Sequence, residues 1–211
     1  MTTYAHLAQA PEMPWPHVHL FWSDERCVPP EHPDSNFGAA AAVLLSRVPV
    51  RPEQVHRIRG EADAAAEAVR YEGVLRRLVR GNPPRVDVIL LGLGEDGHTA
   101  SLFPGSPVLD ERKRCVVAVD PPPGVAHRRI TFTLPLIAAG RAVVFIVAGA
   151  SKADAVSRAL VGRERALPAG KVMAACRRAT WVLDEAAARD LGDALREQGR
   201  MAWVRQTRRA V

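Results

Sequence analysis

The feature that most constrains the fold of this 211-residue chain is the alternation of short apolar runs with segments of helical periodicity. Such alternation is typical of a parallel sheet covered by helices, because parallel strands need crossover connections and lie buried between layers. We therefore predict an α/β fold, with a mostly parallel sheet flanked by helices on both faces in a Rossmann-like layering. The expected buried parallel strands are Val86–Leu91, Cys115–Val119, Arg129–Thr133 and Ala142–Ala148.

The other elements follow from spacing and from helix start and stop signals. A first strand is expected at Val18–Trp22, followed by a long loop from Asp24 to Asn36, whose last residues offer N-caps to an alanine-rich helix ending near Pro49. A short strand is expected around His56–Ile58 and another at Ala179–Leu183. Further helices are expected at Asp63–Val79, Leu134–Ala139, Ser151–Leu160, Ala169–Cys176 and Asp184–Gln198.

No internal repeat, linker or low-complexity tract divides the chain. We expect a single domain over residues 1–211, in which residues 192–211 form the end of the C-terminal helix and a basic tail, loosely held from Trp203 onward.

Charge and cysteine content exclude several classes of protein. The formal net charge of +6 comes from scattered arginines, which favours attraction to small anions over a nucleic-acid partner. The three cysteines are widely spaced and lack metal-ligand spacing, so we expect reduced thiols in a cytoplasmic protein without a metal site. No apolar run approaches the ~18 residues that span a bilayer, and no membrane partner is expected.

The most informative motif is the loop from Gly92 to Pro107. Its glycines match the spacing of a dinucleotide fingerprint, but that site needs a full helix at the last glycine, and Pro104 breaks the chain soon afterwards. We favour a glycine loop at the carboxyl end of a strand, which presents His98 as a group that titrates near neutral pH. A structural histidine is the alternative. Asp96 either orients His98 or only ties the loop.

Two other segments suit a phosphorylated ligand. Asp24 and Arg26 follow the first expected strand, where an acid can bind hydroxyls and a guanidinium can bind phosphate oxygens in a bidentate way. Gly149 to Lys152 follows a later strand and begins a helix, where backbone amides and a lysine can bind an anion. A surface salt bridge and a solvated lysine are the respective alternatives. Cys27 is interpreted as a buried thiol rather than a nucleophile.

These segments together resemble the 6-phosphogluconolactonases, within the larger group that includes the glucosamine-6-phosphate deaminases. The deaminase branch typically carries an Asn-Glu-Pro pattern where this chain has Ser101 to Pro104, so the resemblance favours the lactonases. It rests on Phe21–Gly38, Val86–Pro107, Arg129–Val156 and Trp181–Leu191.

The resemblance implies hydrolysis of 6-phospho-D-glucono-1,5-lactone to 6-phospho-D-gluconate in the oxidative pentose phosphate pathway, with no metal or other cofactor. The expected partner is this small phosphorylated sugar lactone, and the expected oligomeric state is a monomer or weak oligomer. A glucosamine-6-phosphate deaminase or isomerase, or a non-catalytic sugar-phosphate-binding homologue, is the alternative. The implied roles are general base for His98 with Asp96 beside it, phosphate binding for Arg26 and Lys152, substrate positioning for Asp24, and an oxyanion site at the amides of Gly94 and Gly97.

Members of this family usually begin with a helix, a strand and a Gly-Gly-Ser-Thr-Pro loop that helps to bind the phosphate. Residues 2–15 look instead like the helix that follows that loop, so the fold is expected to be N-terminally truncated. We expect a start codon assigned too late; a real truncation and a non-catalytic descendant are the alternatives.

Overall fold

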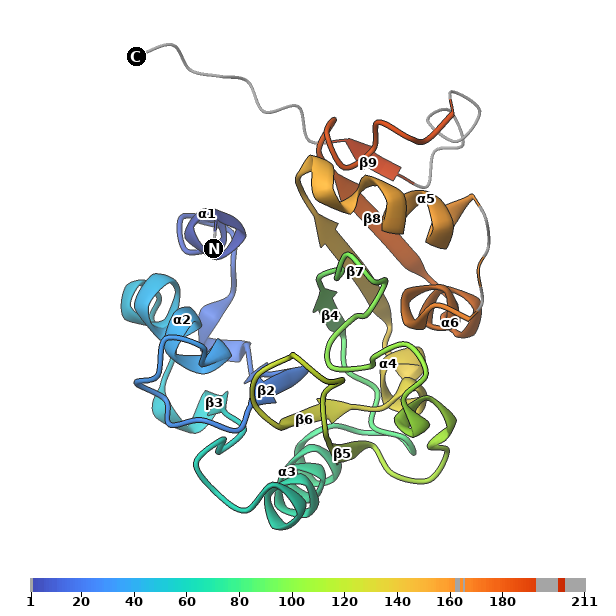
Figure 1. Cartoon of the computed structure of the whole chain (residues 1–211). Coiled ribbons are helices and arrows are strands. Elements are labelled where there is room, and N and C mark those ends of the chain that lie inside the picture. Colours follow the sequence, from blue (N-terminus) through green and yellow to red (C-terminus); the bar gives the residue numbers. More distant parts are fainter. Residues whose placement is uncertain (1, 162–163, 165, 193–200, 204–211) are drawn as a thin grey trace. The chain divides into compact units, whose positions relative to one another are not determined.

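A computed structural model describes residues 2–161, 164, 166–192 and 201–203 (Figure 1). Contacts between residues divide the chain into two compact units. Among the described residues, the first unit contains residues 2–75 and 116–131, and the second contains residues 76–115 and those from 132 onward. The expectation of a single domain stays a prediction.

The second unit is built on a parallel sheet of four strands in the order β4-β7-β8-β9 (Figure 1). Val88 pairs with Ala142, and Val143 pairs with Ala179. On the buried face, the rings of Phe145 and Trp181 stack 4.2 Å apart. The strands are β4 (Val88–Leu91), β7 (Ala142–Val147), β8 (Ala179–Leu183) and β9 (Met201–Trp203).

Three of these strands confirm the predicted parallel sheet, with two corrections. Strand β4 is buried only on alternate residues, and the side chains of Val88 and Leu90 are exposed, so it is not buried on both faces. Strand β9 was not predicted: Met201–Trp203 pairs with β8, where a helix end and tail were expected. Pairing between strands distant in sequence leaves no local pattern that identifies it.

Helices of the second unit lie beside this sheet (Figure 1). Helix α4 (Leu134–Ala139) begins after Thr133, carries a proline in its first turn and buries Leu136 and Ile137. Proline is tolerated there because the first amides of a helix have no partner within it. Helices α5 (Ala153–Leu160) and α6 (Pro168–Ala175) match their predicted positions closely. Residues 185–190 form turns rather than the predicted helix, and its remainder, like the tail after Trp203, lies largely outside the described residues.

The first unit contains two small sheets. One pairs β1 (Leu20–Phe21) with β3 (Val55–His56) in parallel. The other has the order β2-β6-β5, from β2 (Asp24–Arg26), β6 (Arg129–Phe132) and β5 (Val116–Val119). Strand β6 is buried along its length, as predicted, and it runs antiparallel to β2. The stretch Asp24–Arg26 was expected in a loop, and it is a strand.

Helices of the first unit are α1 (Thr2–Leu7), α2 (Asn36–Val43) and α3, which spans Ala64–Leu78 across the boundary between the units. Ser35 is the N-cap of α2, as predicted, and accepts a hydrogen bond from the Gly38 amide. Tyr71 of α3 is buried, and its hydroxyl contacts the backbone of Trp22 and His56, which fixes the helix against β1 and β3. Within the described residues, no helix is both long and apolar enough to cross a membrane.

Candidate functional site

The loop that follows β4 is held in a closed turn by its own hydrogen bonds. The Gly94 amide donates to the carbonyl of His98 at 2.8 Å, and the Gly97 amide donates to the carbonyl of Gly94 at 3.0 Å. The Thr99 hydroxyl donates to the Gly92 carbonyl at 2.8 Å, which ties the loop back to the end of the strand. No helix begins at Gly97, so the loop lacks the helix that a dinucleotide fingerprint needs.

Glycine is required at two positions of this loop for different reasons. A Cβ at Gly94 would collide with the imidazole of His98 and the carboxylate of Asp96. Gly97 has φ +82°, in the left-handed region that side chains disfavour, and a Cβ there would meet Leu167. The two glycines therefore let the loop fold closely around His98.

His98 and Asp96 form a hydrogen-bonded pair at the end of this loop. His98 Nδ1 lies 2.6 Å from Asp96 Oδ1, and the His98 amide donates to the same oxygen at 3.1 Å. The imidazole also packs against the ring of Phe103, with centroids 5.0 Å apart. About a third of the His98 side chain is exposed, so solvent or a ligand can reach it. The carboxylate of Asp96 therefore both orients the imidazole and ties the loop, which were the two roles considered from sequence.

The electrostatics of the pair keep Asp96 ionised. Partial burial raises the pKa of Asp96, but the hydrogen bonds from the amide and imidazole of His98 outweigh it and leave the pKa below its ordinary value. An ionised carboxylate can only accept hydrogen bonds. The proton between the two side chains therefore lies on Nδ1 of His98, and Nε2 is the ring nitrogen that Asp96 does not contact.

The amides expected to form an oxyanion site are already engaged. Those of Gly94, Gly97 and His98 all donate within the loop, to the acceptors described above. They could contact a developing oxyanion only if those bonds loosened.

Lys152 lies in the same unit as His98, at the turn that follows β7. Its Nζ is 3.9 Å from a carboxylate oxygen of Glu95, the residue before Asp96, so the two loops are neighbours. The Gly149 amide is bonded to both carboxylate oxygens of Asp184 at 3.0 Å. That amide is therefore unavailable to an anion, and the ammonium group of Lys152 is the main cationic feature of this turn.

Asp24 and Arg26 lie in β2 of the first unit, on either side of the buried Glu25. The guanidinium of Arg26 donates to the main-chain carbonyl of Asp34 at 2.6 Å, and the side chain of Asn36 donates to the carbonyl of Asp24 at 3.0 Å. Both residues are partly exposed, so their side chains can reach a ligand. They belong to the first unit, whereas His98 and Lys152 belong to the second.

Glu25 has a structural task that the sequence did not reveal. Only 1% of the residue is exposed, and its carboxylate accepts hydrogen bonds from the amides of Arg26, Asn36 and Phe37 and from the Ser35 hydroxyl. Burial raises its pKa, and those donors oppose the rise. A carboxylate at the start of α2 satisfies the amides that a helix leaves free, which fixes the loop around Arg26.

Sequence reasoning missed Arg129, the first residue of β6. Its position is paired with Arg26 across the β2-β6 ladder, and only 9% of the residue is exposed. Nε and Nη1 of the guanidinium are buried without a hydrogen-bond partner among the described residues. Burial lowers the pKa of this guanidinium and the charge of Arg26 lowers it further, while Asp24 and Asp34 oppose the shift.

A buried cation with unsatisfied donors is rare and calls for an explanation. Two neighbouring guanidinium groups repel each other unless an anion lies between or beside them. The sequence signal that could have found Arg129 is weak, because an arginine at the start of an apolar strand resembles a solvated strand end.

Comparison with known proteins agrees with this architecture. Residues 1–181 match the family described as glucosamine-6-phosphate isomerases/6-phosphogluconolactonase. The chain is 43% identical over 194 residues to the 6-phosphogluconolactonase of Mycobacterium tuberculosis, which covers 87% of this chain and 77% of that protein. It is 41% identical over 186 residues to chloroplastic 6-phosphogluconolactonase 3 of Arabidopsis thaliana, covering 84% of this chain and 57% of that protein.

Solved structures of similar fold are also found. The structure of 6-phosphogluconolactonase from Trypanosoma brucei superimposes with a TM-score of 0.76 at 29% identity, over 90% of this chain and 81% of that one. The chain spans less than two thirds of the length of the Arabidopsis relative.

Proposed function

Because this chain belongs to the glucosamine-6-phosphate isomerase/6-phosphogluconolactonase family, we propose that it hydrolyses 6-phospho-D-glucono-1,5-lactone to 6-phospho-D-gluconate, the lactone-opening step of the oxidative pentose phosphate pathway. The relatives of about 40% identity carry the name of that activity. The observation that carries the proposal within the chain is the His98–Asp96 pair on a glycine loop at the carboxyl end of β4.

The pair supports general-base catalysis. Asp96 holds the proton on Nδ1, so the lone pair of His98 Nε2 is free to accept a proton from water. The attacking water oxygen bonds to the lactone carbonyl carbon as His98 takes its proton. The tetrahedral intermediate then expels the ring oxygen, which receives that proton from the imidazolium, so the histidine returns to its neutral state. The proposed route requires no metal or other cofactor.

The phosphate of the substrate is assigned to cationic side chains. Arg26 and Lys152 were expected to bind it from sequence, and we add Arg129 because its buried Nε and Nη1 lack partners within the described chain. Phosphate oxygens accept such hydrogen bonds and neutralise adjacent guanidinium groups, which suits the pairing of Arg129 with Arg26 in the ladder. Asp24, which lies in β2 with Arg26, is proposed to bind hydroxyl groups of the substrate.

The experiment that tests this function follows lactone decay above its spontaneous rate, in the wild-type chain, in His98→Ala and in His17→Ala, an exposed histidine that serves as the control. We expect acceleration by the wild-type chain and the control only. Ammonia release from glucosamine 6-phosphate without lactone acceleration would instead favour the deaminase. Binding of 6-phosphogluconate with neither reaction would favour a non-catalytic sugar-phosphate-binding protein.

A further inference from the structure

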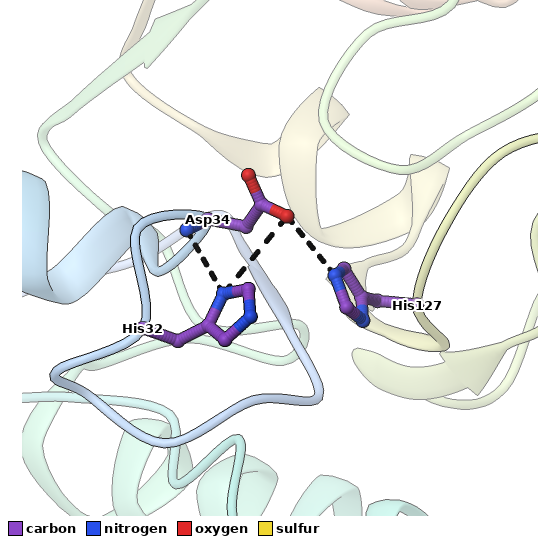
Figure 2. Close-up of side chains that lie close together, drawn as sticks. All are labelled: His32, Asp34 and His127. Atoms are coloured by element: carbon purple, nitrogen blue, oxygen red, sulfur yellow. Dashed lines mark hydrogen bonds and ion pairs between the residues drawn. The ribbon is translucent and has the colours of Figure 1, made fainter.

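Three side chains of the first unit converge in a group that the proposed reaction does not use. His32 and Asp34 come from the loop between β2 and α2, and His127 comes from the loop before β6 (Figure 2). One nitrogen or oxygen of each residue lies within 4.8 Å of those of the other two. Asp34 Oδ2 is 3.0 Å from His127 Nε2 and 3.9 Å from His32 Nδ1.

We propose that His32, Asp34 and His127 form a binding site for a divalent first-row transition metal of the zinc type. Two imidazoles and one carboxylate are the donors that such ions prefer, and three protein ligands leave a fourth position for water. Magnesium and calcium would be poor occupants, because they prefer oxygen donors and higher coordination numbers. The spacing along the sequence gave no hint of the site, since Asp34 and His127 are 93 residues apart.

The separations agree with that coordination. Metal–ligand bonds of about 2.0–2.1 Å place donors about 3.3 Å apart in a tetrahedral site. The measured separations of 3.0 and 3.9 Å from Asp34 Oδ2 bracket that value, and the third separation is at most 4.8 Å. The rings of His32 and His127 are neighbours, with centroids 5.1 Å apart and an interplanar angle of 79°.

Two hydrogen bonds of the group would give way to a bound ion, the one at His32 Nδ1 and the one between His127 Nε2 and Asp34 Oδ2. The amide of Asp34 donates to His32 Nδ1 at 3.1 Å, which keeps that nitrogen deprotonated in the neutral ring. An ion bound there would replace this amide contact. All three side chains are partly exposed, between 30% and 52%, so an ion can enter from solvent.

The neighbouring arginines lower the affinity of this site for cations and favour some metal ions over others. Arg26 donates to the carbonyl of Asp34, and the charge of Arg129 acts on Asp34 as well. These cations oppose any metal that binds through charge alone. They are less of an obstacle to an ion whose bonds to imidazole nitrogen are partly covalent, which again favours zinc, cobalt or nickel over magnesium.

His127 has an unfavourable backbone conformation. Its φ is +65°, in the left-handed region that residues other than glycine seldom adopt. A residue held there indicates that the surrounding structure determines its position. An ion shared by His127 and the 32–34 loop would join two segments distant in sequence, and would stabilise the first unit against unfolding.

The test titrates ZnCl2 into the full-length, metal-free protein by calorimetry, and records the visible spectrum with CoCl2. We expect one Zn2+ to bind per chain and to raise the melting temperature. With Co2+ we expect visible absorption bands typical of a cobalt ion of low coordination number. The variants are His32→Ala and His127→Gly, of which the second accepts the positive φ without strain. Each should weaken zinc binding by at least about tenfold, because loss even of an outer-shell partner of a ligand costs about 10–100-fold.

Matched controls exclude the other histidine sites. His19→Ala removes one member of the stacked His19–His56 pair, whose nitrogens are 2.9 Å apart, and His98→Ala removes the histidine of the glycine loop. Both should retain wild-type zinc affinity. The proposal is overturned if no zinc binds below millimolar concentration, or if His19→Ala or His98→Ala loses binding while His127→Gly keeps it. These readouts do not use the lactone, so they stand or fall apart from the proposed hydrolysis.

Discussion

Replacement of Arg129 by methionine should stabilise the free protein and weaken its binding of phosphate. Methionine fills a similar volume without charge. It removes two buried donors that lack partners, each of which costs about 1–3 kcal/mol, and it removes repulsion from Arg26. Lost attraction to Asp24 and Asp34 and imperfect packing offset part of this gain. We expect a net gain of about 1–3 kcal/mol, in the range seen when buried charges are replaced by apolar residues.

The assay is thermal unfolding with and without inorganic phosphate or 6-phosphogluconate. A gain of this size should raise the melting temperature by roughly 2–4 °C per kcal/mol in the absence of ligand. Added ligand should raise the melting temperature of the wild-type chain but change that of Arg129→Met much less. Arg128→Met is the matched control, because Arg128 is half-exposed and paired with Asp120, and it should change stability by less than about 0.5 kcal/mol.

Two results would refute the reasoning about Arg129. If Arg129→Met unfolds at a lower temperature than the wild-type chain, the guanidinium stabilises the free protein instead of destabilising it. If the ligand stabilises both chains equally, Arg129 does not bind the phosphate, whatever its effect on the free protein.

Four further outcomes are expected. His98→Ala should lower kcat by about 10²- to 10⁴-fold, the usual contribution of a general base. Asp96→Asn should also lower kcat, because an amide no longer fixes the proton on Nδ1 of His98. Steady-state lactone kinetics check both variants, and a large change confined to KM would contradict both expectations. Lys152→Ala should raise KM with little change in kcat, whereas Lys171→Ala should change neither; equal effects of the two would count against a phosphate contact. Partial burial raises the pKa of Cys176 to about 11, so at pH 8 its alkylation by iodoacetamide should be roughly 100-fold slower than that of an ordinary thiol. The rate should increase as pH rises toward that pKa, which peptide mass spectrometry can follow; rapid labelling at pH 8 would show that the pKa is not raised.

Elements with a strong local signature were predicted well from the sequence. Helix α4 and strand β8 occupy the predicted residues, and α3 lies within one residue of its predicted ends. Proline at a helix start, helical periodicity and compact β-branched runs are properties of neighbouring residues, so they can be read without the fold. The glycine loop was equally readable, because the spacing of its glycines, Asp96 and His98 is local.

The pairing of strands and the burial of charged side chains could not be predicted from local patterns. The antiparallel pairing of β2 with β6, the addition of β9 to the sheet, and the burial of Glu25 and Arg129 all depend on contacts between residues far apart in the chain. An acid and an arginine in polar stretches normally indicate solvent exposure. Only the tertiary structure shows that Glu25 accepts hydrogen bonds at the start of α2 and that Arg129 has buried donors.

The sequence by itself therefore determined the α/β class, most helices and strands, the resemblance to the lactonases and the loop that carries His98. Each of these depends on the spacing of residues that are close together in the sequence. The tertiary structure decided which partner each of these groups meets. It placed Asp96 Oδ1 2.6 Å from the imidazole of His98, set Arg129 opposite Arg26, and brought His127 to Asp34 across 93 residues. Hydrogen bonding, desolvation and metal coordination act over a few ångströms in space, and chain folding alone sets those distances.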